Sequence, residues 1–137
     1  YKIALANLEG GRIGIAAQAL GLARAAYDAA LAYARERETF GKKIAEHQAI
    51  AFKLADMAIE IDGARLLVWE AAAALDAGED ASRRVRLAQD QTARVGLAVA
   101  DSAVQVYGGH GYVRDYLPEM SLRNLAGLAS YEALALV

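Results

Sequence analysis

Two short segments in the first half of the sequence carry side chains that could bind a phosphate group. Residues 35–41 read Arg-Glu-Arg-Glu-Thr-Phe-Gly, and residues 46–50 read Glu-His-Gln-Ala-Ile. An arginine near the end of a helix can bind phosphate through two parallel hydrogen bonds, so Arg37 is a candidate ligand. The Thr39 hydroxyl would add a further hydrogen bond. Taken alone, these residues also fit a solvated, charged helix end, with His47 as a surface or capping residue.

A glycine-rich segment follows much later, where residues 105–112 read Gln-Val-Tyr-Gly-Gly-His-Gly-Tyr. Gly108 and Gly109 can end a helix. Because they have no side chains, they also let a ligand approach the backbone closely. The segment is not the Gly-x-Gly-x-x-Gly fingerprint of dinucleotide-binding folds, because no strand precedes it and the spacing differs. It therefore predicts either a helix cap or a surface for ligand contact.

A carboxylate near the end of the sequence, Glu132 after Tyr131, is a candidate general base. A base must lie within hydrogen-bond reach of the proton that it removes, in a site that excludes water. A single glutamate also fits a helix start, where the helix dipole favours negative charge. Other kinds of site are not supported. The chain has no cysteine, its two histidines are too isolated to predict zinc, and Ser102 has no evident histidine partner.

Helices must position these residues, because the chain is rich in alanine and its single proline is Pro118. Apolar residues recur at steps of three and four and predict long helices over about residues 12–40, 46–77 and 81–107. No alternating pattern indicates strands. The predicted buried positions are Ile13, Ala16, Leu20, Ala23, Tyr27, Ala30 and Ala34 in the first helix, Ile50, Leu54, Met57, Ile61, Ala64, Val68, Ala71 and Leu75 in the second, and Val85, Ala88, Thr92, Val95, Val99, Ser102 and Val106 in the third.

Short connections between these helices force antiparallel neighbours, so we expect an all-α, up-down four-helix-type bundle. Gly78 is expected to end the second helix, and Asp80 to cap the third. Beyond residue 112, the sequence predicts short helical segments: one from Pro118 to about Asn124, a break at Gly127, and another helix near the end of the chain. The fourth side of the bundle would be closed by these segments, by a further tail or by another subunit.

Composition limits the class of protein. A chain of 137 residues fits one domain, and its net charge of -2 does not suggest nucleic acid or an anionic membrane as the main partner. No signal peptide and no apolar run of about 20 residues is found, so we expect no membrane span. The lack of cysteine is compatible with a reducing compartment, and a soluble, cytoplasmic domain is expected. Because the sequence starts at Tyr1, we expect a fragment of a longer protein.

Together, Arg-x-Thr-Phe-Gly, the His-Gln pair, Gln-x-x-Gly-Gly and the final Tyr-Glu resemble the C-terminal helical domain of the acyl-CoA dehydrogenases. The resemblance covers nearly the whole chain and implies that residues 1–137 are this domain, without the N-terminal helical and β domains of the family. It implies an oxidoreductase in fatty acid metabolism that uses FAD to convert an acyl-CoA into a trans-2-enoyl-CoA. It also implies an external electron carrier similar to electron-transfer flavoprotein, and a homodimer or homotetramer.

The resemblance also implies roles for individual residues. Glu132, 27 positions after Gln105, matches the catalytic base of the family. Arg37 and Thr39 match residues that hold the pyrophosphate of an FAD bound mainly by the neighbouring subunit. Arg12 matches an arginine near the acyl-CoA site. The other positions that match FAD contacts are His47, Gln48, Gln105, Gly108 and Gly109. No metal site is implied.

The sequence departs from the family pattern near its end. Ala133 and Leu134 stand where many members have glycine and then threonine or serine, Asn124 follows Arg123 where aspartate is usual, and Pro118 is displaced by one position. Some members also carry the base on another helix. Two alternatives therefore stay open: a non-catalytic helical module that contacts FAD or mediates oligomerisation, and an acyl-CoA oxidase or flavin monooxygenase on the same scaffold. The isolated 137 residues are predicted to be inactive and to bind FAD poorly.

Overall fold

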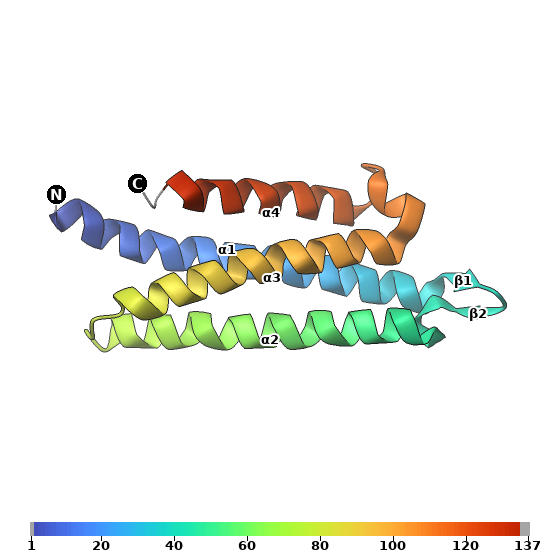
Figure 1. The fold of residues 1–137 in the computed structure, drawn as a ribbon, viewed down its shortest axis with the longest axis horizontal. Helices are drawn as coiled ribbons and strands as arrows, with labels where there is room; N and C mark the ends of the chain where they lie inside the picture. Colours follow the sequence, from blue (N-terminus) through green and yellow to red (C-terminus); the bar gives the residue numbers. More distant parts are fainter. Residues whose placement is uncertain (1, 135–137) are drawn as a thin grey trace.

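The chain forms an up-down bundle of four helices, as the sequence predicts (Figure 1). The structure, a computed structural model, describes the backbone of residues 2–134 and the side chains of residues 11–128. A short hairpin joins the first two helices, a tight turn joins the next two, and a 3-10 segment leads into the last. The helices are α1 (Lys2–Glu36), α2 (Gln48–Asp76), α3 (Ser82–Tyr107) and α4 (Leu117–Leu134).

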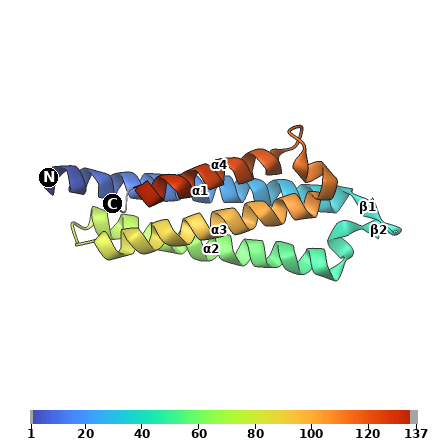
Figure 2. The ribbon, with the colours of Figure 1, turned by 45° about the horizontal axis from the view of Figure 1, so that its top comes forward.

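Helices α1 and α3 form the centre of the bundle, and each of them contacts both α2 and α4 (Figures 1 and 2). A central helix must bury residues on opposite sides, and α1 does so with alanine. Small side chains at the contact let helix axes approach closely. Ile61 of α2, with 1% of its surface exposed, fills the space between these helices. The buried alanines of α1 are Ala16, Ala19, Ala23, Ala26, Ala30 and Ala34.

The end of α1 differs from the prediction. The helix stops at Glu36 instead of continuing to residue 40, and β1 (Glu38–Thr39) pairs with β2 (Lys42–Lys43) in a small antiparallel hairpin. Phe40 and Gly41 form the two-residue loop, with φ values of 52° and 79°. Tight hairpins require such positive φ values at both loop residues. A phenylalanine with this conformation is uncommon, and 97% of the surface of Phe40 is exposed.

The two ends of α2 also lie close to the predicted positions. Residues Ile44–Glu46 form a 3-10 turn, η1, so α2 begins at Gln48, two residues later than expected. At the other end, the prediction for Gly78 is confirmed, because its φ is 72° and its N–H donates to Leu75 O at 3.0 Å. The N–H of Glu79 donates to Ala74 O at the same distance, which completes a Schellman cap.

The start of α3 carries the expected aspartate cap in a shifted form. Ala81 is the residue that flanks the helix, and Asp80 Oδ1 accepts a hydrogen bond of 3.1 Å from the N–H of Ser82. Hydrogen bonds from the side chain and the backbone of Ser82 lower the pKa of Asp80, because they stabilise the ionised carboxylate.

The prediction of short C-terminal segments is wrong, because α4 runs without interruption from Leu117 to Leu134 and passes through Gly127. Glycine costs a helix only about 1 kcal/mol. Burial of Leu125, 1% exposed, contributes more, at roughly 1.5–3 kcal/mol. A β-carbon at Gly96 of α3 would lie 2.7 Å from Leu125 Cδ2, so a larger residue there would require the end of the Leu125 side chain to shift. Helix α4 therefore closes the fourth side of the bundle.

The outer side of α2 carries a row of exposed apolar residues, the α2 row: Phe52, Ile59, Leu66 and Trp69. The first three recur every seven residues, and each of the four has between 61% and 68% of its surface exposed. The opposite side of the same helix carries the buried seam that the sequence predicts, apart from half-buried Ile50 and the more exposed Leu75. Within the described residues, no helix has the length and apolar character needed to cross a membrane.

Candidate functional site

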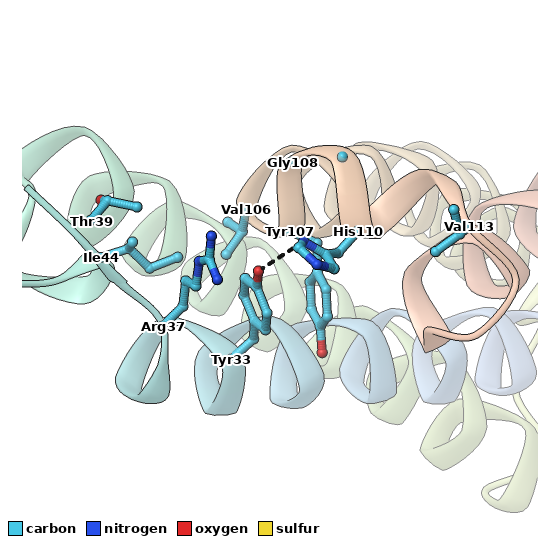
Figure 3. A pocket seen from close by; sticks show the side chains of 10 residues that line it. Tyr33, Arg37, Thr39, Ile44, Val106, Tyr107, Gly108, His110 and Val113 are labelled. Carbon is cyan, nitrogen blue, oxygen red and sulfur yellow. Dashed lines mark hydrogen bonds between the residues drawn. The ribbon is translucent and has the colours of Figure 1, made fainter.

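A cavity of about 610 Å³ lies at the hairpin end of the bundle, between the end of α1, the hairpin and the end of α3 (Figure 3). The 3-10 segment η2 (Gly108–Tyr112) forms another of its walls. The cavity brings together four of the residues predicted to bind FAD, which come from parts of the sequence about 70 positions apart. The lining residues are Tyr33, Arg37, Thr39, Ile44, Val106, Tyr107, Gly108, Gly109, His110 and Val113.

Arg37 places a positive charge beside this cavity. Its backbone N–H donates to Tyr33 O at 2.9 Å, which ends α1 and fixes where the side chain starts. The neighbouring Lys43 is already occupied, because its Nζ lies 2.6 Å from Glu38 Oε1 and 3.1 Å from Glu36 O. A hydrogen bond from Lys43 also lowers the pKa of Glu38. The guanidinium of Arg37 makes no ion pair with any described side chain, so it can bind an anion.

Thr39 is held in place by His47. The Nε2 atom of His47 lies 3.3 Å from both the carbonyl oxygen and Oγ1 of Thr39. A carbonyl oxygen only accepts hydrogen bonds, so Nε2 carries the proton and donates it. The ring of Phe40 packs edge-on against His47, with centroids 6.3 Å apart. His47 therefore supports the hairpin from outside the cavity and does not line it.

The glycine pair leaves the wall of the cavity without side chains. Gly108 has φ 60° and ψ -134°, and its N–H donates to Gln105 O at the end of α3. A β-carbon at Gly108 or Gly109 would meet nothing within 4 Å, so the backbone here borders open space. Gly111 differs, because a β-carbon there would lie 2.5 Å from Val104 O. The first two glycines leave room for a ligand, whereas Gly111 allows close packing.

Four rings, which we call the aromatic cluster, surround this turn: Tyr33, Tyr107, His110 and Tyr116. Tyr33 stacks on Tyr107 with centroids 4.0 Å apart, and the Tyr107 hydroxyl donates to Ala29 O at 3.2 Å. Tyr116 lies 5.6 Å from Tyr107 and 5.4 Å from His110, edge-on to the latter. Burial raises the pKa of Tyr107, so its hydroxyl keeps the proton that it donates.

No role for this cluster follows from the motifs, although two features of the sequence point to it. Tyr33 precedes Arg37 by four positions, which places both residues on one side of a helix. Tyr107 directly precedes the glycine pair. Both residues therefore adjoin predicted ligands in sequence as well as in space.

Other predicted site residues lie outside the cavity. Gln48 is the first residue of α2, Gln105 lies in the last turn of α3, and both are exposed without lining the cavity. Arg12 is remote, because the 24 residues of α1 between Arg12 and Glu36 span about 36 Å. Glu132 belongs to the last turn of α4, but its side chain lies outside the described side chains, as does that of Tyr131.

The backbone places the last turns of α4 beside the N-terminal part of α1, at the end of the bundle opposite the hairpin (Figure 1). The predicted base and Arg12 thus belong to one end of the bundle, and the cavity to the other. Among the described residues, no three His, Asp or Glu side chains gather to hold a metal ion.

The cavity fits the diphosphate part of a nucleotide. An exposed guanidinium without an ion pair supplies charge-assisted hydrogen bonds to phosphate. The glycine turn lets a ligand approach the backbone, and the rings of Tyr33 and His110 supply flat surfaces with polar atoms at their edges. The arrangement is suited to binding an anionic ligand.

Comparison with known proteins connects this chain to one family. The family model described as acyl-CoA dehydrogenase, C-terminal domain, matches residues 1–132. An acyl-CoA dehydrogenase of Bacillus subtilis is 47% identical over 136 residues, covering 96% of this chain and 35% of that protein. The caffeyl-CoA reductase-Etf complex subunit CarC of Acetobacterium woodii is 39% identical over 137 residues, covering 100% of this chain and 36% of that protein.

A solved structure agrees with these matches. Butyryl-CoA dehydrogenase from Megasphaera elsdenii superposes with a TM-score of 0.94 and 41% identity, over 96% of this chain and 34% of that one. The chain therefore spans about a third of the length of the relatives that it matches.

Proposed function

Because this chain belongs to the acyl-CoA dehydrogenase family, as its C-terminal helical domain, we propose that it forms part of an FAD-dependent acyl-CoA dehydrogenase. The family's N-terminal helical and β domains would be supplied by the remainder of a longer protein. FAD is the cofactor that family membership supports, and the cavity at the hairpin end is its proposed contact on this chain. The observation that carries the proposal is the convergence of Arg37, Thr39 and the Gly108–Gly109 turn on that cavity.

In this proposal, Arg37 holds the pyrophosphate of FAD through charge-assisted hydrogen bonds. Thr39 adds its hydroxyl, and His47 keeps Thr39 in position through the contacts of 3.3 Å. The glycine turn lets the adenosine half lie against the backbone. Gln48 and Gln105 are proposed as outer contacts, since both are exposed next to the elements that form the cavity.

Glu132 is the proposed general base, at the other end of the bundle. Flavin, when bound, accepts a hydride from the β-carbon of the acyl chain. Glu132 removes the α-proton of the thioester and must lie within hydrogen-bond reach of it, in a site that excludes water. Arg12 is proposed to lie near the acyl-CoA in this same region, because the last turns of α4 approach the N-terminal part of α1 (Figure 1).

The distance along α1 supports an assembly of more than one copy. About 36 Å of helix separates Arg12 from the hairpin end, so one cofactor molecule cannot contact both groups of residues on the same chain. We propose that the hairpin end contacts the FAD of a neighbouring copy, within a homodimer or homotetramer. The α2 row gives a second copy an apolar surface to cover.

The electron carrier is proposed from the relatives. One of them is named as a subunit of a reductase-Etf complex, which supports an electron-transfer flavoprotein as the partner of the whole protein. The same relative is named as a reductase, so the direction of the reaction has to be tested in both senses.

The test uses the purified full-length protein. We expect a yellow flavoprotein whose flavin absorbance bleaches on addition of an acyl-CoA, or whose reduced flavin is reoxidised by an enoyl-CoA. A stable, colourless oligomer would instead support the non-catalytic module. Hydrogen peroxide formed in proportion to substrate would support an oxidase on this scaffold. An acyl-CoA series of increasing chain length and branching then defines the substrate.

A further inference from the structure

The side chain of His110 borders the cavity, yet no part of the proposed function uses it. It follows the glycine pair directly, and its Nδ1 atom lies 3.4 Å from the hydroxyl oxygen of Tyr33 (Figure 3). We propose that His110 is a further cofactor contact, oriented by Tyr33 so that its Nε2–H donates to a phosphate oxygen beside Arg37. This inference rests on the proposed function, because it assumes that the cavity receives the diphosphate of FAD.

The position of Tyr33 is fixed by packing and not by its contact with His110. Its ring lies flat on that of Tyr107, with an interplanar angle of 13°. Tyr107 is fixed in turn by the hydrogen bond from its hydroxyl to Ala29 O, one helical turn before Tyr33. These contacts join the end of α3 to α1. The Tyr33 hydroxyl therefore meets His110 as part of a rigid pair of rings, which is a good basis for orienting a third.

The contact with Tyr33 is compatible with the form of the imidazole that leaves a donor on the other ring nitrogen. A tyrosine hydroxyl can donate its proton to an unprotonated ring nitrogen. If it donates to Nδ1, the ring proton resides on Nε2, and the hydrogen bond at one nitrogen thus sets the role of the other. Nε2 is then a donor, which is the role that binding to a phosphate requires.

The surroundings of His110 leave that donor available. The edge-on contact with Tyr116, at 90° and 5.4 Å, supports the ring from the side. No ion pair joins His110 to a carboxylate among the described side chains, and its residue surface is exposed. Arg37 lies one helical turn after Tyr33 and lines the same cavity. Arg37 and His110 can therefore contact one anionic group from two sides.

The experiment measures FAD binding to the apoprotein of the full-length enzyme by fluorescence titration, together with binding of ADP, which carries the diphosphate without the flavin. His110→Ala should weaken both by about tenfold, which is the loss of one hydrogen bond to a charged group. Tyr33→Phe keeps the stacked ring and removes only the hydroxyl, so it should cause a smaller loss. Tyr112→Phe is the matched control, since this tyrosine lies in the same 3-10 segment and is 84% exposed.

The double variant distinguishes a role of Tyr33 in orienting His110 from a role in the stability of the protein. If Tyr33 acts through His110, Tyr33→Phe combined with His110→Ala should bind FAD no more weakly than His110→Ala alone. His110→Gln, which keeps an amide donor, should recover part of the affinity. Additive losses, or losses that follow the thermal unfolding midpoint of the apoprotein, would overturn the proposal.

Arg37→Ala distinguishes the proposed role of His110 from the proposed FAD site itself. If it weakens FAD binding while the His110 and Tyr33 variants do not, the role of His110 is wrong and the proposed cofactor site stands. If none of the three variants weakens FAD binding, the cavity is not the FAD site, and both proposals fail.

Discussion

The two ends of this bundle are built in different ways. At the hairpin end, residues from α1, the hairpin, α3 and η2 converge on one cavity. Gly108 in its wall has positive φ, as do the hairpin-loop residues Phe40 and Gly41, which follow the lining residue Thr39 in the chain. At the opposite end, α2 stops in a regular Schellman cap, and α4 continues as plain helix to Leu134. Irregular backbone thus accompanies the proposed cofactor contact, whereas the proposed base is carried on a regular helix.

We interpret the difference as two tasks at the two ends of the bundle: the proposed cofactor contact at the hairpin end and the proposed base at the opposite end. Binding a large anionic ligand needs bare backbone and groups from several segments, and the hairpin end supplies both. Holding one carboxylate in place needs only a helix that is anchored by packing, as the described part of α4 is at Leu122, Leu125 and Leu128. The α1–α3 centre separates the two tasks by a fixed length of helix.

The largest expected effect tests Glu132 as the base, at the end of the bundle opposite the hairpin. Glu132→Gln in the full-length protein should slow the bleaching of flavin by an acyl-CoA about 10²- to 10⁴-fold, since that is the usual contribution of a positioned base. Bound FAD should be unchanged, because FAD is proposed to bind elsewhere. Stopped-flow absorbance measures both. Glu119→Gln, which removes a carboxylate of the same helix that pairs with Arg123, is the control and should bleach at the normal rate.

The next effect tests the hairpin end. Arg37→Ala should raise the dissociation constant of FAD about 10- to 100-fold, as expected for loss of hydrogen bonds to a charged group. Arg37→Lys should recover only part of the affinity, because an ammonium group cannot bind phosphate in the two-pronged geometry of a guanidinium. Arg24→Ala, which breaks a pair with Asp28 on the exposed side of α1, should leave the dissociation constant unchanged.

One type of substitution should have opposite effects at the two ends. Gly111→Ala should destabilise the protein by about 1–3 kcal/mol, because its β-carbon would lie 2.5 Å from a backbone oxygen that cannot easily move. Gly127→Ala in α4 should stabilise it by about 0.5–1 kcal/mol, because nothing lies within 4 Å and alanine favours helix. Denaturant unfolding followed by circular dichroism measures both. Equal effects of the two changes would contradict the contrast between the ends.

The smallest effect concerns pH at the α2–α3 turn. Hydrogen bonds from the side chain and the backbone of Ser82 hold the folded pKa of Asp80 below its ordinary value of 3.8. The carboxylate therefore adds stability above the unfolded pKa, and this contribution is lost as the pH falls through the folded pKa. Between about pH 6 and pH 2, the unfolding midpoint should fall less for Asp80→Asn than for the unmodified protein. Asp101→Asn is the control, since no hydrogen bond to Asp101 is found among the described residues.

Periodicity was sufficient to predict the bundle, because the buried seam follows helical spacing. Met57, Ile61 and Val99 are buried as expected. The continuation of α4 through Gly127 could not be predicted from the sequence. The local cost of glycine is offset by contacts of α4 with residues about 30 positions earlier, such as Gly96. The hairpin was missed for a related reason. Phenylalanine is a poor signal for a turn that requires positive φ, so the helix was extended through Phe40.

The site could be predicted only in part. Motif spacing pointed to Arg37, Thr39 and the glycine pair, and the structure brings these residues to one cavity. The contact between Tyr33 and His110 joins residues 77 positions apart, and their closeness to predicted ligands in the sequence does not show that the two residues meet. Such a contact depends on how α1 and α3 are aligned, which periodicity alone does not determine.

The conformation of Phe40 has a consequence for protein engineering. A non-glycine residue with left-handed backbone costs roughly 1–2 kcal/mol, and the almost fully exposed ring recovers little of that within its own chain. Screening random libraries of the separate domain for heat resistance should therefore enrich glycine or asparagine at this turn. The same clones would lose the exposed aromatic ring at the tip of the hairpin.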